Sequence, residues 1–215
     1  MEPDKSPADL HINEQEGVIK FDLEFTKSAA PSEAQYRELE YWRQRLFQLG
    51  LTGQDPTRYG GLAYGNVSRK INGCQFLISG TQTGRMARLN SEHYCFVDEV
   101  DLENNRLRAH GPIPPSSEAM THGAIYQLQH PKIAVVLHVH CPALWHNSRA
   151  FSLPETRLET PYGTPAMAEE VAEICVSSPN SIIAMRGHLD GILAVGEDLA
   201  ETAKRLMALA QEATR

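Results

Sequence analysis

The chain has 215 residues, a length that suits one compact domain with a core of its own. Hydrophobic residues make up 41% and charged residues 22%, which is ordinary for a globular protein, and no apolar run approaches the roughly 18–20 residues that cross a bilayer. The formal net charge of −7 argues against sequence-independent binding to nucleic acid, but a local nest of backbone N–H groups could still bind an anionic substrate.

The first residues, MEPDKSPADL, are acidic and polar and have neither the basic start nor the apolar stretch of a secretory signal. We therefore expect a poorly ordered leader over residues 1–16 and a cytoplasmic protein. The four cysteines, Cys74, Cys95, Cys141 and Cys175, include no C-x-x-C pair, which favours buried thiols in a reducing compartment.

Hydrophobic periodicity predicts a strand and then a helix after the leader. Residues 18–26 alternate apolar and polar side chains, as a half-buried strand does, and we expect this strand to pair at an edge of its own sheet or of a neighbouring subunit's sheet. The sequence Ser32-Glu33-Ala34-Gln35 is a capping box that opens a helix ending near Gly50. Residues 53–65 are predicted to form a loop.

The middle of the chain predicts short strands, then a helix, then a buried strand. The strands are expected at residues 74–79 and 94–97, followed by a polar loop at 101–105. A helix should begin near Ser116 and end by Pro131. The apolar run at 133–140 predicts a strand.

In the last third, Thr164 and Pro165 form an N-cap followed by proline, which opens a helix to about residue 177. Strands are expected at 182–185 and 192–195, and a terminal helix at 197–214. Strands and helices are interleaved, but short turns join several strand pairs. The predicted fold class is therefore α/β, a three-layer α/β/α arrangement with a central mixed, largely antiparallel sheet.

Two histidines end the strand predicted at 133–140. Side chains two apart on a strand point the same way, so His138 and His140 could bring their ring nitrogens to one ion, unless they are merely hydrogen-bonded or solvent-exposed. A catalytic zinc-type site commonly has three protein ligands, and the third candidate is His188, in a glycine-flanked turn after another strand. Asp190 is either an outer carboxylate that orients a ligand or a plain turn residue.

The start of the helix near Ser116 offers a second set of polar groups. Ser116 and Ser117 would present hydroxyls and free N–H groups to an anion at the positive end of the helix dipole. Glu118 is either an acid/base or a residue that complements the dipole. His122 lies on the same helix face, and we interpret it as a packing residue rather than a ligand.

Taken in order, these segments resemble the class II aldolase/adducin family over about residues 33–214. The matching motifs are Gly65-Asn66-Val67-Ser68, Thr81-Gln82-Thr83-Gly84, Pro115-Ser116-Ser117-Glu118, His138-Val139-His140 and Gly187-His188. The resemblance implies one domain over residues 17–215 and a homotetramer with sites between subunits. It also implies a divalent metal on His138, His140 and His188, with Zn²⁺ expected first and Mn²⁺, Co²⁺ or Fe²⁺ as alternatives.

The same resemblance implies a role for each site residue. Glu118 would be the acid/base, and the substrate phosphate would be held by Asn66, Ser68, Thr83, Gly84, Ser116 and Ser117. The implied activity is that of a metal-dependent, aldolase-like lyase. It would cleave or form a C–C bond beside the carbonyl of a small hydroxy-carbonyl or sugar-phosphate substrate, through a metal-stabilised enediolate. Epimerase, decarboxylase or dehydratase chemistry and a non-catalytic, adducin-like scaffold are the alternatives.

The sequence also departs from the family pattern. Gln82 stands where the phosphate-binding turn usually has proline, and Leu189 and Asp190 follow the third histidine where the family usually has glycine. Tyr162 is the only tyrosine between residues 141 and 163, and it does not match the family's catalytic tyrosine. The predicted strand at 18–26 is an addition to the family pattern.

Overall fold

The computed structural model describes residues 17–215, so the leader predicted over residues 1–16 lies outside the described residues. The strands of the main sheet are β1 (Asp22–Lys27), β4 (Asn66–Asn72), β5 (Gln75–Ser79), β6 (Tyr94–Asp101), β7 (Arg106–Gly111), β8 (Val135–His140), β9 (Ile182–Ala184) and β10 (Gly191–Gly196). A second, small sheet pairs β2 (Gly53–Gln54) with β3 (Ala63–Tyr64). The helices are α2 (Glu33–Gln48), α3 (Ala119–Gln127), α4 (Pro142–His146), α5 (Pro165–Ser177) and α6 (Leu199–Ala213).

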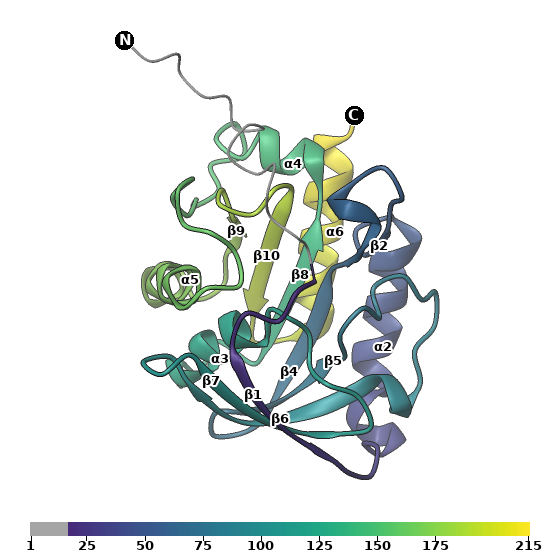
Figure 1. Cartoon of the computed structure of the whole chain (residues 1–215). Coiled ribbons are helices and arrows are strands. Elements are labelled where there is room, and N and C mark those ends of the chain that lie inside the picture. The colour runs from purple at the N-terminus through teal and green to yellow at the C-terminus, as the bar shows by residue number, and fades with distance from the viewer. Residues whose placement is uncertain (1–16) are drawn as a thin grey trace.

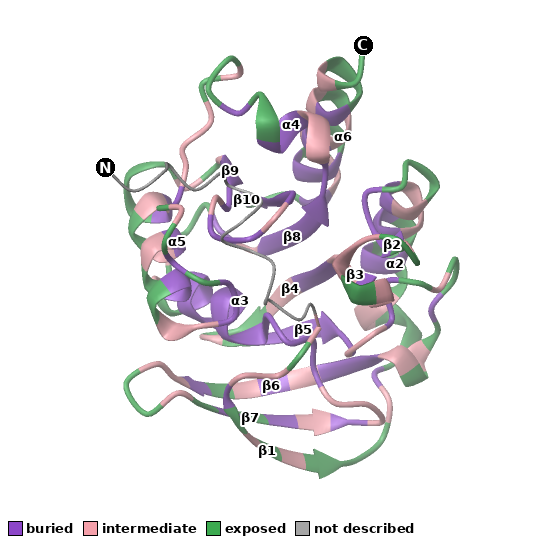
Figure 2. Cartoon of the chain, turned by 45° about the horizontal axis from the view of Figure 1, so that its top comes forward, coloured by how far each residue is buried: buried purple, intermediate pink, exposed green. Residues whose placement is uncertain are grey.

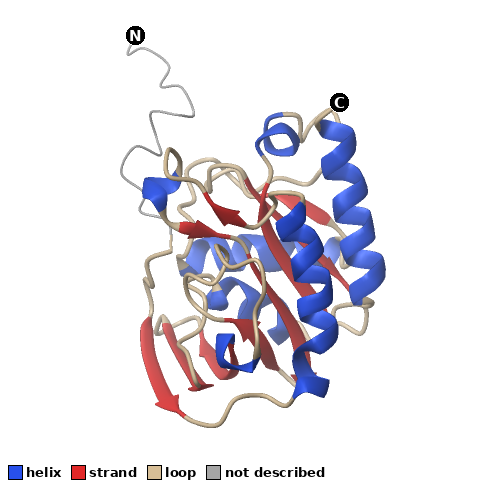
Figure 3. Cartoon of the chain, turned by 90° about the vertical axis from the view of Figure 1, so that its right-hand side faces the viewer, coloured by secondary structure: helices blue, strands red, loops and turns tan. Residues whose placement is uncertain are grey.

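One eight-stranded sheet forms the middle layer, in the order β1-β7-β6-β5-β4-β8-β10-β9. Neighbouring strands are antiparallel except for β1 and β7, which are parallel. Helices α3 and α5 cover one face of the sheet, and α2, α4 and α6 cover the other (Figures 1 and 3). The predicted three-layer fold with a mixed, largely antiparallel sheet is confirmed.

Each helical layer buries its own apolar core against the sheet. Ile125 of α3 and Val171 of α5 belong to one core, and Leu46 of α2 and Leu206 of α6 belong to the other. Removing a side chain of this kind from water stabilises the fold by roughly 1.5–3 kcal/mol. Strands β8 and β10 are buried along their whole length, whereas the residues of β1 at the edge are exposed or intermediate (Figure 2).

The alternation of side chains along β8 decides which face of the sheet carries its histidines. Leu137 and Val139 point into the core under α2 and α6, and Val136 points into the core under α3 and α5. His138 and His140 follow Val136 at two-residue steps, so they lie on the α3 side of the sheet. The start of α3 is therefore the helix end that can reach them.

The edge of the sheet differs from the sequence prediction. The strand predicted at 18–26 begins at Asp22 and ends at Lys27, and it pairs within its own chain, with β7. Strand β7 was not predicted, because Leu107 and Ala109 are its only buried apolar residues and arginines alternate with them. A stretch so polar forms a strand because β6 and β1 pair with it on both sides.

The motif Gly65-Asn66-Val67-Ser68 is a turn residue followed by the start of a strand. Gly65 turns the chain with a φ of +80°, and Asn66 already belongs to β4. In that strand Asn66 pairs with His138 of β8. Strand β4 was not predicted because its residues are mostly polar. Pairing with β5 and β8 fixes its place in the sheet. The loop predicted at 53–65 also contains the two short strands β2 and β3.

The predicted starts of α2 and α5 are confirmed by their capping contacts, whereas the helix predicted near Ser116 begins at Ala119. The backbone N–H of Ser32 donates to Oε1 of Gln35 at 2.8 Å, which completes the capping box of α2. Thr164 caps α5, since its Oγ1 accepts from the backbone N of Met167 at 3.3 Å. The terminal helix α6 begins at Leu199, two residues later than predicted.

All four cysteines are free, and three of them are buried while Cys74 is partly exposed. Among residues 17–215, no helix is both long enough and apolar enough to cross a membrane.

Candidate functional site

Strand pairing brings the three candidate histidines together. His138 and His140 lie on β8, and the turn between β9 and β10 carries His188. That turn is tight, because Gly191 N donates to His188 O at 2.9 Å and His188 N donates to Met185 O at 2.9 Å. Since Gly191 pairs with His140 in the sheet, the turn lies directly beside the end of β8.

The three imidazole rings form one buried cluster. Their ring centres are 5.1 Å apart for His138 and His140, 4.9 Å for His138 and His188, and 4.8 Å for His140 and His188. One ligand atom from each ring can be chosen so that all lie within 4.8 Å of one another, and no ring is more than 2% exposed. Among the described residues, His138 Nε2 has no hydrogen-bond partner although it is buried.

This donor set fits a divalent metal of the zinc type. Imidazole nitrogen is a ligand that zinc and its neighbours accept, and three protein nitrogens leave a position for substrate. Metal binding needs the neutral ring. Burial, with the nearby His188 and His138 adding to it, lowers the pKa of His140 well below its usual value, which keeps that ring neutral.

Glu118 lies directly against the cluster. It is the N-cap residue of α3, and its side chain is 2% exposed. One carboxylate oxygen contacts Nδ1 of His138, and the other lies 3.2 Å from Nδ1 of His188. Asn66 Nδ2 donates a 2.8 Å hydrogen bond to the same carboxylate. Burial alone would raise the pKa of Glu118, but the two imidazoles outweigh it and hold the pKa well below its usual range.

His122 lies outside the histidine cluster. Its Nδ1 is 2.7 Å from Oγ of Ser68, and the same hydroxyl is 2.8 Å from Oη of Tyr126. Burial lowers the pKa of His122 to about 3, against the opposing effect of Glu118, so the ring is neutral at physiological pH. His122 therefore acts in packing, as the sequence suggested. The Ser68 hydroxyl therefore joins β4 to α3, so the contacts of this predicted phosphate ligand are with the protein itself.

The remaining predicted anion-binding segments are brought side by side. An isolated bridge pairs Gly80 with Pro115, and Ser116 N donates to Ser79 O at 3.3 Å. The turn that holds Thr83 and Gly84 thus lies next to the two serines that precede Glu118. A Cβ added at Gly84 would lie 2.2 Å from the backbone O of Tyr64, so the turn also packs against the backbone that leads into β4.

Gln82, which stands where the family pattern has proline, has a backbone conformation that proline cannot adopt. Gln82 has a φ of +57°, which a proline ring locked near −65° cannot adopt. Its Oε1 accepts a hydrogen bond from Ala63 N at 3.0 Å. The side chain therefore holds this turn against β3, where the family pattern uses the rigidity of proline.

Sequence reasoning missed Arg58 and Tyr59, which lie in the segment predicted as a loop. The ring of Tyr59 meets that of His140 edge to face, with centres 4.5 Å apart. Its Oη donates a 2.7 Å hydrogen bond to Asp190 Oδ2, which Arg58 also contacts. Burial and then Asp190 raise the pKa of Tyr59 well above its usual value, so the phenol keeps its proton. Asp190 is thus more than a turn residue, although it holds the Tyr59 loop rather than a histidine.

Tyr162, which the sequence left unassigned, stacks on the third histidine. The ring centres of Tyr162 and His188 are 4.3 Å apart and the planes differ by 19°. Tyr162 N also donates to Gly187 O at 3.2 Å, and its side chain is 1% exposed. The sequence could not predict the contact between Tyr162 and His188, because no local pattern links the two positions.

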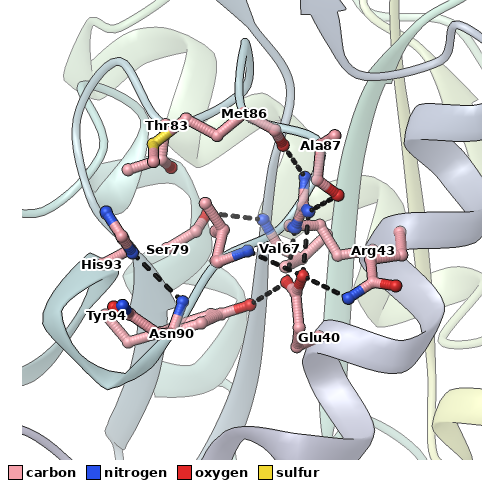
Figure 4. A network of polar contacts seen from close by, with 12 residues as sticks. Glu40, Arg43, Val67, Ser79, Thr83, Met86, Ala87, Asn90, His93 and Tyr94 are labelled. Atoms are coloured by element: carbon pink, nitrogen blue, oxygen red, sulfur yellow. Dashed lines mark hydrogen bonds and ion pairs between the residues drawn. The ribbon is translucent and has the colours of Figure 1, made fainter.

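A buried polar network holds the loop that carries the anion-binding turn (Figure 4). Arg43 of α2 donates to the backbone O of Met86 at 3.0 Å and of Ala87 at 2.9 Å. Its partner Glu40 accepts from Leu89 N at 2.8 Å. Burial would raise the pKa of Glu40, but Arg43 and the Leu89 N–H outweigh it and lower the pKa. Helix α2 thereby fixes the loop after Thr83.

Comparison with known proteins places this chain in context. Residues 57–214 match the family model of the class II aldolase and adducin N-terminal domain. The l-fuculose-1-phosphate aldolase from Thermus thermophilus is 24% identical with a TM-score of 0.62, and the match covers 85% of this chain and 92% of that one. The sugar-phosphate aldolase from Thermotoga maritima is 16% identical with a TM-score of 0.66, and the match covers 85% of this chain and 93% of that one.

A third similar structure belongs to a protein for which reactions other than aldol cleavage are also considered. YgbL from Klebsiella pneumoniae, for which aldolase, epimerase and decarboxylase activity are considered, is 20% identical with a TM-score of 0.58, over 86% of this chain and 89% of that one. No curated protein matches the chain by sequence. At these identities the likeness shows the fold.

Proposed function

Because this chain belongs to the class II aldolase and adducin family, we propose that it is a metal-dependent lyase acting on a small hydroxy-carbonyl compound or sugar phosphate. The reaction would form or cleave a C–C bond next to the substrate carbonyl. The observation that carries the proposal is the convergence of three buried imidazoles with one buried carboxylate against them.

His138, His140 and His188 would hold the metal, with Zn²⁺ as the first candidate and Mn²⁺, Co²⁺ or Fe²⁺ as alternatives. When bound, the ion would act as a Lewis acid that polarises the substrate carbonyl and stabilises the negative charge that develops on its oxygen. The burial of the three rings supports this, since it excludes water from the charges that change during the reaction.

Glu118 would give or take the proton at the carbon beside the carbonyl. Its position supports this role, because Asn66 holds the carboxylate from β4 while the N-terminus of α3 fixes its backbone. A carboxylate held in this way does not have to be reoriented at each turnover.

The substrate anion would be bound by Thr83, Gly84, Ser116 and Ser117, whose segments are neighbours in the structure. Asn66 and Ser68 belong to the same predicted pocket. Their side chains bond to Glu118 and to α3, so we assign them mainly to holding the site together.

We also propose that residues 17–215 act as one domain that assembles as a homotetramer in the cytoplasm, with sites between subunits. The family resemblance supports the assembly. Light scattering of the purified protein should give four times the mass of one chain, and a monomeric mass would contradict the proposal.

The experiment that tests the function combines metal analysis with an activity screen. The purified chain should carry about one zinc-type ion per subunit and turn over at least one member of a panel of ketose phosphates and hydroxy-acids. His140→Ala should lose both the metal and the turnover. His146→Ala is the matched control, because His146 is exposed just after β8, and it should keep both.

Two results would contradict the proposal. Full activity of His140→Ala in the presence of a chelator would show that the reaction does not need the metal. A chain without stoichiometric metal and without turnover would favour the scaffold alternative.

A further inference from the structure

The segment before β1 contacts two residues that lie far apart in the chain, Gln82 and Tyr162. At one end Gly17 packs against Gln82, since a Cβ added at Gly17 would lie 2.0 Å from Nε2 of Gln82. At the other end Lys20 reaches Tyr162. Its Nζ lies 3.9 Å from the centre of the ring and donates a 2.8 Å hydrogen bond to the backbone O of the same residue.

The backbone of Lys20 is itself held in place. Its carbonyl O accepts from Asn105 Nδ2 at 2.9 Å, and Asp22 N donates to Asn105 O at 2.9 Å. The next residue, Phe21, is 6% exposed and belongs to the core under α3 and α5. The Lys20 ammonium therefore extends from a fixed base rather than from a loose end of the chain.

Lys20, Tyr162 and His188 lie in series. The ammonium contacts the Tyr162 ring, and that ring stacks on His188 with centres 4.3 Å apart. The backbones behind the stack are also in close contact, because a Cβ added at Gly187 would lie 1.7 Å from the backbone O of Thr160. The groups that surround a metal-binding histidine fix its ring orientation and so tune its affinity for the ion.

We propose that Lys20 is a positioning residue for the third metal ligand, acting through Tyr162. Its cation–π contact and its hydrogen bond fix Tyr162, and the fixed ring sets the plane of the His188 imidazole. The inference rests on the proposed function, since it needs His188 to bind the metal. It gives the N-terminal segment, which lies outside the family motifs, a role in the site.

The test first compares metal binding by three single variants of the full-length chain and then repeats Lys20→Met in a Tyr162→Leu background. Lys20→Met keeps the apolar stem and removes the charge and the donor, Lys20→Arg keeps both, and Lys27→Met is the matched control at the exposed end of β1. Zinc affinity is measured by competition with a chromophoric chelator, and the Co²⁺ absorption spectrum reports the ligand geometry. Neither readout depends on turnover.

We expect Lys20→Met to weaken zinc binding roughly three- to tenfold, less than the roughly 10–100-fold of a residue bonded directly to a ligand, and to shift the Co²⁺ bands. Lys20→Arg and Lys27→Met should match the unmodified chain. In a Tyr162→Leu background, Lys20→Met should have no further effect, because the pathway to His188 is already broken. Circular dichroism establishes that each variant is folded.

An affinity and Co²⁺ spectrum of Lys20→Met equal to those of a metal-binding wild type would overturn the role of Lys20 alone. An equal loss of affinity in the Tyr162→Leu background would overturn it as well. A wild-type chain that binds no zinc would overturn the proposed function too, so the two failures are distinguishable.

Discussion

Glu118 contacts the histidine cluster through both of its carboxylate oxygens. It touches two of the three imidazoles and accepts a hydrogen bond from Asn66. In the sequence, its position at a helix start was also suited to complementing the helix dipole. The contacts favour the acid/base role, since a residue that only complements the dipole has no need of two imidazole neighbours.

Glu118→Gln should therefore separate chemistry from metal binding. The amide keeps the size of the side chain but cannot take up the proton, so kcat should fall by roughly 10²–10⁴-fold while the metal content stays the same. Steady-state kinetics and metal analysis on one preparation measure both. Glu103→Gln, at an exposed position, is the control. A kcat of Glu118→Gln close to that of the wild type would show that Glu118 does not transfer the proton.

At the residue scale, the sequence predicted the residues that stand in local motifs and missed those that come from distant segments. The three histidines, Glu118 and the serines before it all have a local signal. Arg58 and Tyr59 do not, since their partner Asp190 is more than 130 positions away. A hydrogen bond across such a separation leaves no local spacing pattern.

At the scale of elements, β8 was predictable and β4 and β7 were not. The run from Val135 to Leu137 is apolar on both faces, as a central strand must be. Charged or polar residues occupy most positions of β4 and half of those of β7, and both strands owe their structure to their neighbours. The capping residues, in contrast, act locally, and the helix starts predicted from Ser32 and Thr164 agree with the structure.

The contact of α2 with the anion-binding loop leads to a prediction about stability. Glu40 and Arg43 are paired at 2.6 Å with side chains 7% and 2% exposed. Removing one partner of a buried pair leaves an uncompensated charge, so Glu40→Gln should lower the free energy of unfolding by roughly 3–5 kcal/mol at pH 7. Urea unfolding measures the change.

The pH dependence of that difference follows from the lowered pKa of Glu40. Folding depresses this pKa below its usual value of 4.5, so the unfolded chain takes up the proton first as the pH falls. The stability from the pair is present above that value and is lost as the pH falls through the folded pKa. The gap between wild type and Glu40→Gln should therefore be largest at pH 7 and shrink in acid. Glu38→Gln, at an exposed position of the same helix, should show a small gap, and an equally large one would contradict the account.

At the scale of the whole molecule, the sheet order explains why the site forms where it does. Strand β8 lies between β4 and β10, so Asn66 of β4 and the turn carrying His188 reach it from its two sides. Helix α3 adds Glu118 from the layer above. The three-layer fold followed from interleaved strands and helices, but the order of the strands depends on long-range pairing and could not be predicted from local patterns.

The central claim is that His138, His140 and His188 bind one ion together. X-ray absorption at the zinc edge of the metal-loaded protein tests it most directly, because the scattering gives the number of imidazole rings bound to the ion. The account predicts three imidazole nitrogens at about 2.0–2.1 Å, and two in His188→Ala. A spectrum with sulfur ligands, or one that His188→Ala leaves unchanged, would contradict it.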